Sequence, residues 1–100
     1  MITILKTPSA DRDLNFIWLR IARHSIINAN NIIEAIKQKI DLLRLFPDGG
    51  ANCPELGDNI QRLVSGDYLI YYLHQEQSAI ILRILDGRNK IGPEMFGEEE

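Results

Sequence analysis

The hydrophobic pattern of this chain changes its period once, and this change limits the possible folds more than any other feature. Between residues 9 and 46, apolar side chains recur every three or four positions, which predicts amphipathic helices. Between residues 60 and 85, aromatic and β-branched residues form short runs, which is typical of strands. A further β-branched run at residues 2–6 predicts an N-terminal strand. Segregated helices and strands indicate the α+β class.

Two helices are predicted between the first strand and residue 46. Ser9 is the expected N-cap of the first, and Ser25 that of the second. Each helix has one apolar stripe, made of Leu14, Ile17, Trp18 and Ile21 in the first and of Ala29, Ile32, Ile33, Ile36, Ile40 and Leu43 in the second. Proline and glycine at residues 47–50 end the second helix. Because almost no linker separates the helices, we expect an antiparallel helical hairpin.

Three further strands are predicted at residues 60–65, 68–74 and 79–85. Short polar turns separate them, so they form a three-stranded antiparallel meander. With the N-terminal strand, they make one small, mainly antiparallel sheet on which the helical hairpin packs. The length of 100 residues suits a single domain over residues 1–100, with an acidic tail at about 92–100.

Cysteine and histidine usage argues against a metal or cofactor. A single cysteine, Cys53, permits no disulfide within the chain and no cysteine-rich metal site. His24 and His74 are far apart in the sequence, so no metal site and no cofactor is expected. The N-terminus lacks the pattern of a signal peptide, and every apolar run is too short to cross a membrane. The expected location is therefore the cytoplasm, with no membrane partner.

Arg83 lies in the middle of an apolar strand and must therefore reach a partner or an open surface. Two interpretations stay open: a salt bridge with Asp67 or Asp86, and an anion or partner site on the open face of the sheet. Strand alternation assigns the neighbouring residues to two faces, with Arg83, Ile81 and Leu85 on one and Leu82 and Ile84 on the other.

A series of short motifs runs through residues 2–91. They are Ala10-x-x-Asp13-Leu14-x-x-Ile17-Trp18, Ser25-x-x-x-Ala29-x-x-Ile32-Ile33-x-x-Ile36, Leu45-Phe46-Pro47-x-x-Gly50, Pro54-Glu55-Leu56-Gly57, Arg62-Leu63, Gly66-Asp67-Tyr68-Leu69-Ile70-Tyr71-Tyr72 and Ile81-Leu82-Arg83-Ile84-Leu85-Asp86-Gly87-Arg88. In their order and spacing, the chain resembles the ParE branch of the RelE/ParE toxin superfamily of bacterial type II toxin–antitoxin systems.

This resemblance implies a toxin, associated with plasmid stabilisation, that a cognate antitoxin neutralises by folding on its surface. ParE-like members inhibit DNA gyrase, whereas RelE-like members cut mRNA on the ribosome. The toxin itself would meet operator DNA only through the antitoxin.

The C-terminal residues favour the gyrase inhibitor over the enzyme. In RelE-like toxins, basic side chains act with a C-terminal tyrosine or histidine, but this chain has neither after residue 85. Asp86 stands where the family often has histidine, and its carboxylate would repel RNA. The expected target-binding residues are Arg83, Arg88, Asn89 and Lys90. Two alternatives remain: a ribonuclease that uses Arg62, Arg83 and Arg88, and a toxin-fold homologue that has lost its activity.

The distribution of charge agrees with a protein target. The net charge is −3, yet residues 1–90 carry +1, because four of the glutamates follow residue 90. Residues 12–44 carry +3, which suits an acidic antitoxin segment. An acidic tail suits neither RNA nor DNA, so direct nucleic-acid binding is not expected.

Overall fold

A computed structural model describes residues 1–96. Of the predicted acidic tail, residues 97–100, with their three glutamates, lie outside the described residues. The elements are β1 (Thr3–Lys6), α1 (Pro8–Ala22), α2 (Ile26–Asp41), the 3-10 turn η1 (Leu42–Arg44), β2 (Ala51–Asn52), β3 (Ile60–Ser65), β4 (Tyr68–Gln75), β5 (Ser78–Asp86) and the 3-10 turn η2 (Pro93–Met95).

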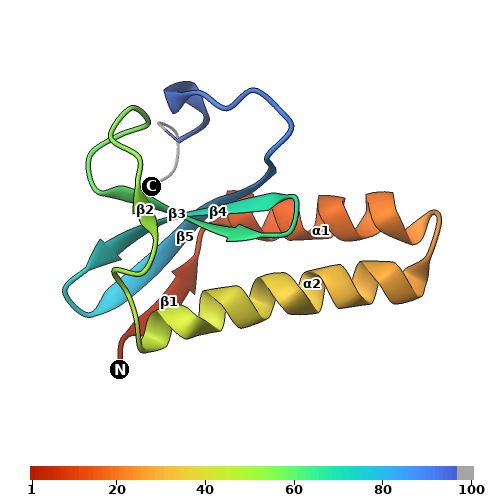
Figure 1. Ribbon diagram of the computed structural model, residues 1–100, viewed down its shortest axis with the longest axis horizontal. Coiled ribbons are helices and arrows are strands. Elements are labelled where there is room, and N and C mark those ends of the chain that lie inside the picture. The colour runs from red at the N-terminus through yellow and green to blue at the C-terminus, as the bar shows by residue number, and fades with distance from the viewer. Residues whose placement is uncertain (97–100) are drawn as a thin grey trace.

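One five-stranded sheet has the order β1-β5-β4-β3-β2, with β1 parallel to β5 and the other neighbours antiparallel. The two helices lie on one face of this sheet, and the loops that follow β2 and β5 lie on the other (Figure 1). The predicted α+β class, the helical hairpin and the three-stranded meander are confirmed. The expected count of four strands is wrong, because β2 has only two residues and so shows no period in the sequence.

The N-cap of the first helix lies two residues earlier than predicted. Thr7, not Ser9, is the N-cap, because Pro8 suits the first helical position, where no N–H donor is required. The Thr7 hydroxyl accepts a hydrogen bond from the Ala10 N–H at 3.1 Å and donates one to the Leu82 carbonyl at 2.8 Å. Thr7 thus fixes the start of α1 against β5. The second cap is confirmed, since the Ser25 hydroxyl accepts from the Asn28 N–H.

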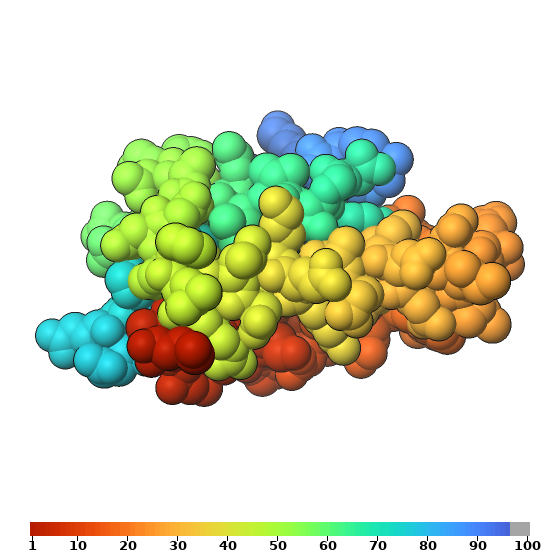
Figure 2. Space-filling model, turned by 60° about the horizontal axis from the view of Figure 1, so that its bottom comes forward, coloured from red at the N-terminus to blue at the C-terminus, as the bar shows by residue number. Residues whose placement is uncertain are grey.

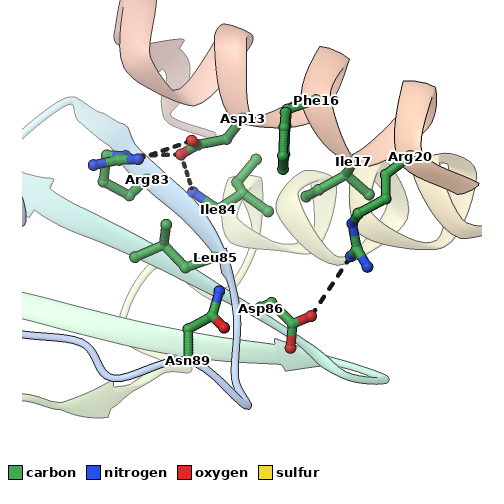
Figure 3. Close-up of a pocket in the computed structure, with 9 residues that line it drawn as sticks. All are labelled: Asp13, Phe16, Ile17, Arg20, Arg83, Ile84, Leu85, Asp86 and Asn89. Carbon is green, nitrogen blue, oxygen red and sulfur yellow. Dashed lines mark hydrogen bonds and ion pairs between the residues drawn. The ribbon is translucent and has the colours of Figure 1, made fainter.

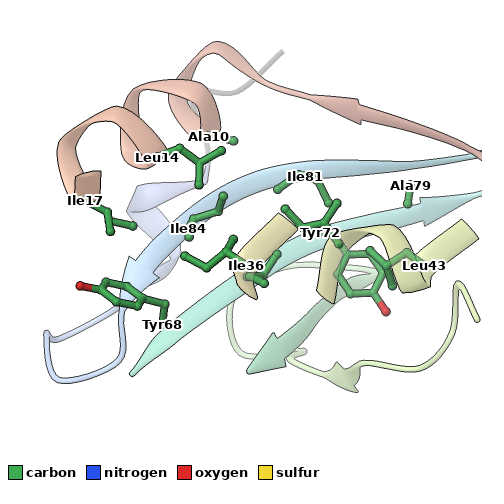
Figure 4. Close-up of a cluster of buried hydrophobic side chains, with 12 residues drawn as sticks. Ala10, Leu14, Ile17, Ile36, Leu43, Tyr68, Tyr72, Ala79, Ile81 and Ile84 are labelled. Carbon is green, nitrogen blue, oxygen red and sulfur yellow. The ribbon is translucent and has the colours of Figure 1, made fainter. Parts of the chain in front are cut away.

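The main core lies between the helical hairpin and the sheet (Figure 4). The apolar stripes of α1 and α2 meet side chains of β4 and β5 there, as the periodicity predicts. Trp18 is the exception: it is half-buried, belongs to neither cluster of the described residues, and its Nε1 donates to Asn30 Oδ1 on α2 at 2.8 Å. The buried members of the main core are Ala10, Leu14, Ile17, Ile36, Ile40, Leu43, Tyr68, Ile70, Tyr72, Ala79, Ile81 and Ile84.

A second apolar cluster, here called the open-face cluster, covers the opposite face of the sheet. Its buried members are Cys53, Leu56, Ile60, Tyr71, Leu82 and Phe96. Ile91 and Met95 pack against it from the segment that follows β5. Both faces of the sheet are therefore covered, which explains why β5 is apolar on both sides.

A β-bulge in β5 changes the predicted face of two residues. Tyr71 pairs with Arg83 and Tyr72 with Ile81, so Leu82 is the additional residue on β5. Leu82 therefore joins the open-face cluster, whereas Ile81 lies in the helix-side core. The prediction that Arg83 shares a face with Ile81 is wrong, because strict alternation does not survive an inserted residue.

Candidate target-binding site

A hollow of about 370 Å³ lies between α1 and the end of β5 (Figure 3). It forms because β1 ends at Lys6 and leaves the outer edge of β5 open beyond this point. Helix α1 then crosses this edge in place of a strand. The lining residues are Asp13, Phe16, Ile17, Arg20, Arg83, Ile84, Leu85, Asp86 and Asn89.

Asp13 closes the open edge of β5 and holds Arg83. Its Oδ2 accepts the Ile84 backbone N–H at 2.9 Å. Its two oxygens also accept the Arg83 guanidinium, at 2.8 Å from Nε and 2.9 Å from Nη2. Arg83 is thus a structural ion-pair partner, but the expectation of Asp67 or Asp86 as its partner is wrong. Both side chains are mostly buried, with 14% of Asp13 and 23% of Arg83 exposed.

Asp86 fixes the loop that follows β5. Its carboxylate accepts from Arg88 Nε at 2.9 Å, from Arg88 Nη2 at 2.6 Å and from the Arg88 backbone N–H at 2.9 Å. Arg20 approaches the same carboxylate to 3.5 Å. The hydrogen bonds from the Arg88 side chain and backbone lower the pKa of Asp86 to about 2. The same pair raises the pKa of Arg88 above its usual value.

Arg20 joins this loop to the body of the protein. Its Nη2 donates to the Tyr68 hydroxyl at 2.7 Å, and Tyr68 is the register partner of Asp86 across β4 and β5. Helix α1, β4, β5 and the loop thereby share one network of charged hydrogen bonds. Asp13 and Arg20 were not predicted as parts of the site, because their partners lie at least 48 residues away and no local pattern reveals such a pairing.

The four predicted target-binding residues occupy three kinds of position. Arg83 and Asn89 line the hollow, and the Asn89 N–H bonds the Asp86 carbonyl at 3.1 Å. Arg88 turns back onto Asp86 but keeps 64% of its side chain exposed. Lys90 is exposed and lies outside the lining of the hollow. Residues 88–90 therefore form an exposed polar segment that Asp86 holds at its base.

The residues of the ribonuclease alternative do not meet in one place. Arg62 and Arg83 are both register partners of Tyr71, which places these three residues in one row across β3, β4 and β5. Arg88 instead pairs with Asp86 beside α1. Tyr71 is the tyrosine that sequence analysis did not connect with these arginines, because the connection depends on strand register.

Tyr71 is buried and is poorly suited to proton transfer. Only 2% of the residue is exposed, and the Phe96 ring packs edge-on against it with centroids 5.1 Å apart. Burial is the main reason that the pKa of Tyr71 is raised, although a hydrogen bond with Arg62 opposes the shift. A phenol with a raised pKa keeps its proton and is a weak acid, and this ring is closed off from a phosphate in solution.

The histidines and Cys53 are the remaining candidates for a metal site or a nucleophile. The described residues contain no group of three or more histidine, cysteine or acidic side chains that could hold a metal ion. His74 contacts Asp48 at 2.7 Å, whereas His24 is exposed at the end of α1. Burial raises the pKa of the Cys53 thiol, which disfavours a nucleophilic thiolate. Within residues 1–96, no helix is both long and apolar enough to span a bilayer.

Comparison with known proteins identifies the family. The sequence model of the ParE toxin of the type II toxin–antitoxin system parDE matches residues 4–91. Because this match covers most of the chain, the chain belongs to the ParE toxin family. No curated protein matches the sequence.

Two solved structures share the fold. One chain in the structure of a chromosomal ParDE toxin–antitoxin system from P. aeruginosa is 19% identical to this chain in sequence, with a TM-score of 0.74. The match covers 86% of this chain and 96% of the other. A conserved hypothetical protein from Helicobacter pylori, determined in solution, is also 19% identical, with a TM-score of 0.55, over 89% and 98% of the two chains.

Proposed function

We propose that this ParE-family toxin inhibits DNA gyrase and contacts it through Arg88, Asn89 and Lys90, with Arg83 behind them in the hollow. The observation that carries this proposal is the fixation of the loop by Asp86, which binds Arg88 through three hydrogen bonds. A loop held in this way loses little conformational freedom on binding, which favours affinity for a protein target. Such a toxin acts by binding and requires no cofactor, and it would meet gyrase in the cytoplasm.

The burial of Tyr71 favours an inhibitor over a ribonuclease. The row of Arg62, Tyr71 and Arg83 has the residue types that could bind and cleave a phosphodiester. Phe96 covers its central tyrosine, however, and the Asp13 carboxylate binds Arg83. Both observations leave the row without an accessible acid–base group. They agree equally well with a toxin-fold homologue that has lost its activity.

Neutralisation by a cognate antitoxin is supported by the surface of the helical hairpin. Its tip projects beyond the sheet (Figures 1 and 2). Four large apolar side chains in the second half of α1 and at the start of α2 are more than half exposed: Phe16, Leu19, Ile26 and Ile27. Since residues 12–44 also carry a net charge of +3, an amphipathic acidic segment would complement this surface. Operator DNA would then be bound by the antitoxin part of the complex.

A supercoiling assay tests the proposed target. Purified toxin is added to gyrase, relaxed plasmid and ATP, and we expect the supercoiled product to decrease with toxin concentration. The antitoxin encoded beside the toxin should restore supercoiling when it is added in equal amount. If supercoiling continues unchanged at a large excess of folded toxin, gyrase is not the target.

A second assay separates the inhibitor from the ribonuclease. After the toxin is induced in growing cells, mRNA on translating ribosomes is mapped for new 5′ ends. We expect no cleavage that depends on the toxin. Cleavage that disappears in the Arg62→Ala variant would instead favour the ribonuclease and would overturn the gyrase proposal.

A further inference from the structure

We propose that residues 91–96, here called the C-terminal strap, form a latch that opens away from the sheet while the rest of the domain stays folded. The strap follows the exposed polar segment at residues 88–90, and its opening does not depend on the identity of the target. Ile91, Met95 and Phe96 of the strap cover the open face of the sheet but belong to no strand.

Within residues 1–96, few directional contacts hold the strap. The Phe96 ring meets Tyr71 edge-on, at an interplanar angle of 68°. Arg83 Nη1 donates to the Met95 carbonyl at 3.3 Å, which is long for a hydrogen bond. The Met95 and Phe96 N–H groups bond Gly92 and Pro93, within the strap itself. In the described chain the strap pairs with no strand, so its release breaks no ladder of the sheet.

The sheet does not need the strap for its main core. The helix-side core contains no residue of the strap, and it lies on the opposite face of the sheet. The pairing of β3, β4 and β5 involves no residue of the strap. Segments with few backbone hydrogen bonds to the body open locally at much lower free energy than the global fold.

A buried polar group lies in the row of residues beside the strap. Arg62 Nε is buried and has no hydrogen-bond partner among the described residues. Arg62 is the register partner of Tyr71, whose ring packs against Phe96 of the strap. Because a buried donor without a partner carries a desolvation cost, we expect this cost to fall if opening of the strap admits water to the row.

Cys53 provides a direct measurement of the opening. It is the sole cysteine of the sequence, it is 1% exposed, and it belongs to the same cluster as Phe96. Its labelling by a thiol reagent, DTNB, reports how often the cluster opens. The variant Phe96→Ala removes the main apolar contact of the strap, and we expect Cys53 to react about tenfold faster in it than in the wild type.

The matched control is Phe46→Ala, which deletes the same atoms from a side chain that is 64% exposed and lies outside the open-face cluster. This variant should react at the wild-type rate. A milder strap variant, Ile91→Ala, should accelerate labelling in the same direction by a smaller factor. It keeps the test decisive if Phe96→Ala folds poorly.

The dependence on urea distinguishes a latch from global unfolding. Opening of the strap exposes little surface, so the labelling rate should rise only weakly with urea below the unfolding transition. Amide hydrogen exchange should be faster at Met95 and Phe96 in the Phe96→Ala variant and unchanged in β4. The proposal is overturned if labelling follows the full urea dependence of global unfolding, or if both strap variants react at the wild-type rate.

Discussion

At the scale of single residues, Asp13 joins parts of the chain that are far apart. One carboxylate accepts a backbone N–H from the open edge of β5 and binds the Arg83 guanidinium with both of its oxygens. A mostly buried arginine is tolerated in a sheet only when its charge is balanced in this way. Asp13 therefore fixes the orientation of the Arg83 side chain and the geometry of the hollow beside α1.

The variant Asp13→Asn tests this role. It keeps the size of the side chain but removes the negative charge, which breaks the ion pair between Asp13 and the mostly buried Arg83. We expect a loss of about 2–3 kcal/mol in the free energy of unfolding, measured by urea denaturation. The control Asp11→Asn affects an exposed carboxylate 3.7 Å from Lys6 and should cost less than about 0.5 kcal/mol. Equal losses in the two variants would contradict this account of Asp13.

The lowered pKa of Asp86 leads us to expect that the free energy of unfolding depends on pH. Its pKa is about 2 in the folded protein, against an ordinary value of 3.8. A carboxyl with a lowered pKa stabilises the fold at pH values above its ordinary pKa, and this contribution disappears as the pH falls toward the folded value.

The variant Asp86→Asn should therefore differ most from the wild type above about pH 4. We expect the difference in unfolding free energy to shrink steadily between about pH 4 and pH 2, as measured by urea titrations. The control Asp58→Asn measures how much of the change comes from removing any exposed carboxylate. A difference that stays constant down to pH 2 would show that Arg88 does not stabilise the ionised carboxylate.

At the scale of elements, prediction succeeds where one local signal dominates. The predicted ranges of β3, β4 and β5 agree with the structure within one residue, because runs of aromatic and β-branched residues between polar turns suffice to place them. The predicted end of the second helix is wrong, because α2 ends at Asp41 and η1 follows it, before the proline and glycine at residues 47–50. The short β2, the cap at Thr7 and the bulge at Leu82 were missed. β2 and the bulge appear only in the pairing of neighbouring strands. The cap at Thr7 has a local signal in the adjacent Pro8, which the choice of Ser9 overlooked.

The two N-caps should differ in strength for the same reason. Thr7 caps α1 and also donates to a carbonyl of β5, whereas Ser25 caps α2 alone. We expect Thr7→Ala to lower the free energy of unfolding by about 2 kcal/mol and Ser25→Ala by about 1 kcal/mol. Thermal and urea unfolding of both variants measure the difference. A cost for Ser25→Ala that equals or exceeds that of Thr7→Ala would show that the bond to β5 adds nothing.

At the scale of the whole molecule, the sheet separates two surfaces with different chemistry. The helical hairpin carries exposed apolar side chains and a net positive charge, and the loop after β5 carries an exposed polar segment at residues 88–90. The family and the fold could be predicted from the order of motifs along the chain. The network of Asp13, Arg20 and Asp86 could not, because it exists only once α1 lies across the end of β5.

Inhibition of gyrase by a charge variant of the loop tests the central claim most directly. Lys90→Glu reverses an exposed charge in the proposed contact, and Lys39→Glu reverses an equally exposed charge on α2 as the control. In a supercoiling assay we expect Lys90→Glu to need at least about tenfold more toxin for half inhibition, while Lys39→Glu stays close to the wild type. If wild-type toxin inhibits gyrase and Lys90→Glu inhibits it equally well, the loop does not make the contact. If the folded wild type does not inhibit at all, the proposed function is wrong.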